Sequence, residues 1–129
     1  MTEESILFPE VKVGDIVVKP WSFGMLFSIS EDLEQVLNRM EETDLISKLE
    51  KSGGLISYTL LARIFTIASN HVLKIIAVTI NKTEDEVRAL SMEDGMKIAM
   101  IIYNQNKQTI MSSLKNVFSP SVQESPEGQ

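Results

Sequence analysis

The pattern of apolar and polar positions predicts a short hairpin at the start of the chain, followed by helices. Residues 11–13 and 16–18 are two runs rich in Val and Ile on either side of Gly14-Asp15, which is typical of a two-residue hairpin turn of type I′ or II′. Gly14 supplies the positive φ that such a turn needs. Pro20 ends the second strand because it has no N–H to donate to a ladder.

The next stretch predicts two helices in succession. Ser22 is placed to cap a first helix over Phe23–Ile29, and Ser28 with Glu31 has the spacing of a capping box that starts a second helix. The second helix carries one apolar stripe at i, i+3, i+4 and i+7, formed by Leu33, Val36, Leu37 and Met40.

Polar and glycine-rich breaks then set off a short helix and a long one. The residues from Glu41 to Asp44 interrupt the pattern, and a short helix from Leu45 ends at Gly53-Gly54. Ser57 caps a long helix over 58–80 whose apolar residues cover most of its circumference. Such a helix lies at the centre of its fold or against a partner, and we expect it to be the core helix.

The last third predicts a short helix and one continuous final helix. Thr83 begins a capping box for a helix that extends to Leu90, and Ser91 caps the final helix over about 92–117. Asn106 lies beside the apolar stripe of that final helix although Asn is a poor helix former. Two interpretations stay open for it, an ordinary boundary residue or a side chain that hydrogen-bonds another helix end.

These elements predict a mainly α fold, a helical bundle of four to six helices with a short N-terminal β-hairpin. We expect an N-terminal arm over 1–9, a single helical domain over 10–118 and a disordered acidic tail over 119–129, which is rich in Ser, Pro and Glu.

Charge placement argues against nucleic acid and membrane as partners. The net charge is −6, and its sign alternates between successive segments, without the cluster of cations that phosphate binding usually needs. The most apolar stretch, 60–80, has the length of a membrane span. It contains Arg63, His71 and Lys74, which are costly near a bilayer centre, so a buried helix is the better interpretation.

Candidate chemistry is sparse. The chain has no Cys and a single histidine, His71, which we interpret as a polar residue on one side of the core helix. The acids at 84–86 fit the first turn of a helix as well as a metal site would. No phosphate-binding glycine loop or nucleophile motif occurs. We therefore predict no catalytic residue, no metal and no cofactor.

The densest local signal is the aromatic segment 19–27, Lys-Pro-Trp-Ser-Phe-Gly-Met-Leu-Phe. It either seats the hairpin on the first helix or anchors a partner, because large rings bury much area in both roles. The sequence-based candidates for partner binding are Trp21, Phe23, Met25 and Phe27, with Met100, Tyr103 and Met111 from the final helix.

The order of a short strand pair, KPWSFGMLFSI, an acidic helix, a long apolar helix and NKTEDEVRALSMEDGMKIAMIIYNQN resembles the small tail assembly chaperones of tailed bacteriophages. The resemblance covers about residues 10–110. It departs from the family pattern after Asn106, where the family often has an aromatic residue. It implies binding of the tape measure protein, and of the tail tube protein as a second partner, in the host cell cytoplasm before tail assembly. Self-association is a further expectation.

Three other functions stay open. A structural tail or baseplate component of the phage particle has the same interaction chemistry but remains in the virion tail. A helical DNA-binding regulator needs more than the three Lys of the final helix. An enzyme is the least favoured, because the chain offers few groups for catalysis.

Overall fold

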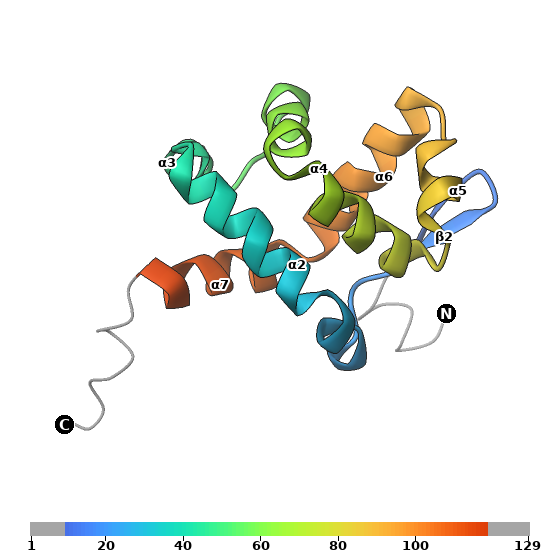
Figure 1. Cartoon of the computed structure of the whole chain (residues 1–129), viewed down its shortest axis with the longest axis horizontal. Coiled ribbons are helices and arrows are strands. Elements are labelled where there is room, and N and C mark those ends of the chain that lie inside the picture. The colour runs from blue at the N-terminus through green and yellow to red at the C-terminus, as the bar shows by residue number, and fades with distance from the viewer. Residues whose placement is uncertain (1–9, 119–129) are drawn as a thin grey trace.

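The computed structural model describes residues 10–118, with side chains placed through residue 112, so the arm 1–9 and the tail 119–129 lie outside the described residues. The described residues form one hairpin and six helices (Figure 1). The strands are β1 (Val11–Val13) and β2 (Ile16–Val18), and the helices are α2 (Phe23–Glu42), α3 (Leu45–Lys51), α4 (Tyr58–Ile80), α5 (Glu84–Arg88), α6 (Met92–Gln105) and α7 (Lys107–Phe118). The prediction of a mainly α fold with a short hairpin is confirmed.

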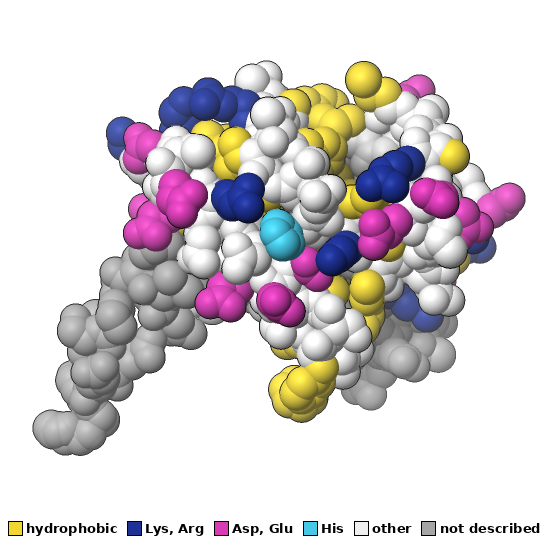
Figure 2. Space-filling model, in the orientation of Figure 1, with side chains coloured by type: hydrophobic (Ala, Val, Ile, Leu, Met, Phe, Trp, Pro, Cys, Tyr) yellow, Lys and Arg dark blue, Asp and Glu magenta, His cyan; other side chains and the backbone are white. Residues whose placement is uncertain are grey.

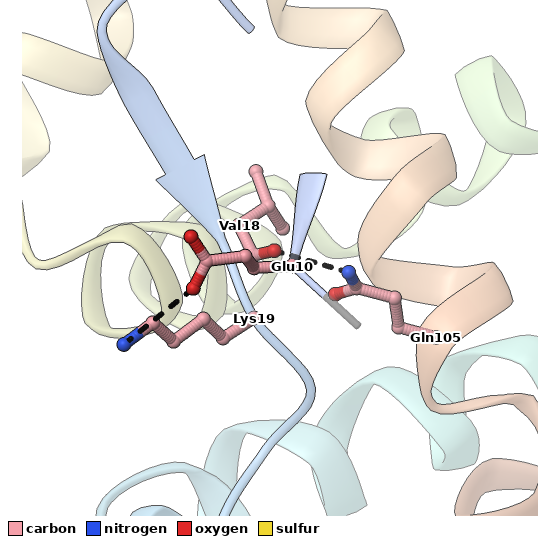
Figure 3. A network of polar contacts seen from close by, with 4 residues as sticks. All are labelled: Glu10, Val18, Lys19 and Gln105. Atoms are coloured by element: carbon pink, nitrogen blue, oxygen red, sulfur yellow. Dashed lines mark hydrogen bonds and ion pairs between the residues drawn. The ribbon is translucent and has the colours of Figure 1, made fainter. Parts of the chain in front are cut away.

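The hairpin has the predicted turn. The two strands are antiparallel, with Val11 opposite Val18, and Gly14 has φ +62°. Asp15 is not among the residues with positive φ, so the signs fit type II′ and not type I′. The end of β2 is tied to α6, because Gln105 Nε2 donates to the Val18 carbonyl at 3.0 Å (Figure 3).

Figure 3 also shows a surface ion pair where the hairpin ends. Lys19 Nζ lies 4.0 Å from Glu10 Oε1, and both side chains are at least half exposed. A pair in that setting contributes little to stability. The buried Val13 and Val18 therefore hold the hairpin on α4 and α6.

Helix α2 is one continuous helix, so the predicted second start at Ser28 is wrong. The Ser22 hydroxyl accepts from Met25 N at 3.2 Å and caps the helix, as predicted. Ile29 is fully buried and extends the apolar stripe of α2 upstream of Leu33. Because that stripe runs unbroken against α4, the helix continues through Ser28, whose capping potential is not used.

Helix α4 has the predicted ends but is kinked. Ser57 accepts from Leu60 N at 3.1 Å, and Asn81 closes the helix in the left-handed conformation. Between them Ala68 leaves helical geometry, with φ −142° and ψ 39°. Next to it, the Ile67 carbonyl accepts from Arg39 Nη1 of α2 at 2.9 Å. A side chain of a neighbouring helix thus satisfies a carbonyl at the kink.

The kinked helix serves two apolar clusters, which we call the α2 cluster and the hairpin cluster. The α2 cluster joins α2, α3 and α4 with Tyr103 and Ile110; the hairpin cluster joins the strands, α4 and α6. Trp21 packs against both of them. The buried members of the hairpin cluster are Val13, Val18, Leu61, Ile76, Ile80, Ile98, Ala99 and Ile102.

The C-terminal helices begin as predicted, but the final helix is divided. Thr83 and Glu86 make both hydrogen bonds of the capping box, and the Ser91 hydroxyl accepts from Asp94 N. The prediction of one final helix is wrong, because α6 ends at Gln105 and Asn106 has φ −118° and ψ 19°. The Asn106 side chain accepts a hydrogen bond from the Trp21 N–H and donates one to the Ile102 carbonyl, which favours the break.

Candidate partner-binding site

Trp21 is partly buried and is held against the fold by two hydrogen bonds. Its backbone N–H donates to Asn106 Oδ1 at 2.9 Å, and its indole Nε1–H donates to Thr79 Oγ1 at 2.9 Å. Trp21 directly precedes the cap of α2, so the interpretation that Asn106 hydrogen-bonds another helix end is confirmed. The Asn106 Nδ2 group donates to the Ile102 carbonyl at 2.8 Å. Trp21 therefore joins the hairpin, α4 and the α6–α7 break.

Phe23 and Phe27 lie on the opposite, open side of the same segment. Their side chains are 79% and 75% exposed. The rings meet edge to face, with centroids 5.2 Å apart and planes at 81°. Figure 2 shows hydrophobic side chains projecting at the bottom of the view, at the start of α2. Met25, between the two Phe in sequence, is partly buried.

The three candidates on the final helices are used within the fold. Tyr103 is only 8% exposed, its hydroxyl donates to the Gly54 carbonyl at 2.7 Å, and burial raises its pKa. Met111 Sδ lies 4.0 Å from that hydroxyl, and Met100 is partly buried against the hairpin cluster. Of the seven predicted partner-binding residues, Phe23 and Phe27 are therefore the ones left largely open to a partner.

A second apolar surface is a groove between α4, α5 and α6. None of the seven residues predicted from the sequence lines it. Its volume is about 660 Å³. The largest apolar side chains along it are Phe65, Leu73, Ile76, Leu90, Met92 and Met96. In Figure 2 hydrophobic side chains gather at the top of the view between the starts of α4 and α6. We call this surface the α4–α6 groove.

The kink of α4 places residues from both of its halves along the groove. Phe65 precedes Ala68 and Leu73 follows it, and both line the same depression. Met92, at the first position of α6, is 85% exposed. The signal for this groove in the sequence was that apolar residues surround most of α4. A single cluster could not have buried every side of that helix.

The single histidine forms a cross-link between helices. His71 Nδ1 lies 2.8 Å from Asp32 Oδ1, and both side chains are mostly buried. This contact joins α4 to α2 one turn beyond the kink. In the described part of the chain, no group of three or more Asp, Glu, His or Cys side chains is placed to hold a metal ion.

One helix among the described residues, α4, is long and apolar enough to cross a membrane by length and composition alone. The core helix of a water-soluble fold passes the same test, so this property does not decide between the two environments. Comparisons with models of known protein families, with curated proteins and with solved structures find no match for this chain.

Proposed function

We propose that this protein is a tail assembly chaperone of a tailed bacteriophage, and that its α4–α6 groove receives apolar helical segments of the tape measure protein before the tail assembles. The open groove is the observation that carries the binding part of the proposal. The identity of the partner rests on the sequence resemblance described above.

The groove has the chemistry that an amphipathic helix needs. Its lining is mainly apolar, with Ser69, Asn70, Arg88 and Ser91 as polar members. A helix-in-groove complex places side chains at i, i+3, i+4 and i+7 into such a lining. Met92 and Met96 add long flexible thioethers that adapt to more than one apolar sequence.

The net charge supports the other part of a chaperone's task, which is to keep the bound chain soluble. A tape measure protein, as the resemblance implies, is long, helical and apolar, and such a chain aggregates while it is unshielded. Covering its apolar face with a chain of net charge −6 gives the complex a charged exterior, which keeps it soluble.

The test is co-expression of this chain with a tape measure protein from the genome that encodes it. Met92→Glu puts a charge at the groove, and because Met92 is 85% exposed the fold should be unaffected. Gly95→Leu fills the groove instead. No described atom lies within 4 Å of a Cβ built at Gly95, so the first atom of the new side chain has room. We expect the unaltered chain to keep the tape measure protein in the supernatant. With either variant, the yield of soluble tape measure protein should fall at least about tenfold.

The matched control is Leu55→Glu, which changes a 69% exposed side chain away from the groove. It should solubilise the tape measure protein as well as the unaltered chain does. Equal yields from all four proteins would contradict the groove as the binding site. Mass spectrometry of purified particles tests the chaperone role itself. A chaperone is absent from them, whereas a structural tail or baseplate component is present in stoichiometric amount.

A further inference from the structure

The first turns of α2 present an aromatic face that no other described element covers. Phe23 and Phe27 form a ridge along it, and both rings are at least three-quarters exposed. Gly24 and Ser28 follow the same i, i+4 spacing in the next row, and both are exposed. We call these four residues the FG face.

The FG face carries no charged residue, although the chain as a whole is acidic. From Pro20 to Ser30 there is no Asp, Glu, Lys or Arg, whereas the whole chain carries −6. Two copies of one acidic protein repel each other over most of their surfaces. An uncharged apolar face is where they meet with the least repulsion and the largest gain from burial.

Among the residues that the structure describes, no contact explains why position 24 is a glycine. It is the second residue of α2, where the helix does not require a glycine, and its φ is not positive. A Cβ added there would meet only Ser22 Oγ, at 3.9 Å. The missing side chain leaves the helix surface open beside the two Phe rings.

From these observations we propose that a second copy of this chain packs on the FG face, α2 against α2 about a two-fold axis. An isologous interface requires one surface that is complementary to itself. The FG face meets that requirement because its ridge of Phe23 and Phe27 fits the row of Gly24 and Ser28 on the other copy, as i±4 ridges pack into i±4 grooves. The Phe rings of the two copies then meet through edges and faces, which aromatic pairs favour.

The available area makes this dimer a weak one. A Phe side chain has roughly 200 Å² of surface. Because each of the four rings is already about one-quarter covered within its own monomer, together they can bury on the order of 600 Å² in the dimer. Stable interfaces bury at least about 1,200 Å² in total. The proposed dimer therefore forms at high protein concentration and dissociates on dilution.

Sedimentation velocity of the full chain, from about 1 µM to about 1 mM, tests the proposal. We expect the unaltered chain to shift from monomer to dimer across this range. Phe23→Ser with Phe27→Ser should weaken the dimer at least tenfold. Gly24→Ala should also weaken it severalfold while raising the melting temperature, because Ala favours the helix but fills the row that receives the ring. A general loss of folding cannot produce those two opposite changes.

The control is Leu55→Ser, which removes another large exposed side chain outside the FG face and should leave the dimer unchanged. Met92→Glu should also leave it unchanged, which separates this proposal from the function of the α4–α6 groove. A chain that stays monomeric at every concentration overturns the proposal, and so does a dimer that survives the double Phe substitution. If a monomeric chain loses capture of a tail protein on that substitution, the FG face binds a different partner and the second-copy proposal is wrong.

Discussion

Trp21 and the pair Phe23–Phe27 lie two to six residues apart in one aromatic segment, yet they face opposite environments. Trp21 precedes the cap of α2 and turns inward, where Thr79 and Asn106 receive its two N–H groups. The two Phe lie on the helix itself and face outward. Aromatic density alone thus does not separate a structural ring from an exposed one. Polar partners distant in sequence do, because the N–H groups of the partly buried Trp21 need them and an exposed Phe ring does not.

The largest expected difference between the two regions is in folding stability. Trp21→Ala removes a ring that contacts both apolar clusters and leaves Thr79 without a donor from the indole, so we expect a loss of about 3 kcal/mol in urea unfolding. Trp21→Phe keeps most of the ring and loses one hydrogen bond, for about 1 kcal/mol. A loss under 1 kcal/mol for the Ala variant would mean that Trp21 does not join the two clusters.

An intermediate effect is expected at the residue that holds Trp21. Asn106→Ala leaves the Trp21 N–H without its acceptor, and Asn106 is only 5% exposed, so the free energy of unfolding should fall by about 2 kcal/mol. Asn104→Ala is the matched control. Asn104 is exposed in the last turn of α6, and the change should stabilise the protein by up to about 0.5 kcal/mol through helix propensity. Equal effects at the two positions would contradict a tertiary role for Asn106.

The contrast between contacts local in sequence and contacts to distant residues also explains which parts of the fold the sequence could predict. The hairpin and the caps at Ser22, Ser57 and Thr83 are made by residues within a few positions of each other, and their patterns were sufficient. The kink at Ala68 and the break at Asn106 coincide with hydrogen bonds from residues 28 or 85 positions away. A sequence pattern contains no sign of which distant residue will supply such a bond.

The prediction of partner-binding surfaces was limited for a similar reason, because exposure also depends on contacts with residues distant in sequence. Composition placed Phe23 and Tyr103 in one candidate set, although Tyr103 is buried under Gly54 and Phe23 is open. The α4–α6 groove was missed because it depends on how α4 bends and where α6 lies beside it. An apolar circumference indicated that α4 had more than one neighbour, but not which of its sides would stay uncovered.

The smallest expected effect on stability is at the exposed pair itself. Phe23→Ser with Phe27→Ser should change the free energy of unfolding by less than about 0.5 kcal/mol, because Ser and Phe have similar helix propensities and an i, i+4 ring pair contributes only about 0.2–0.5 kcal/mol. The same double variant is expected to weaken self-association at least tenfold. Urea unfolding at low protein concentration measures the first effect without contribution from the second. A loss comparable with that of Trp21→Ala would place these rings in the core and remove the contrast between the two halves of the segment.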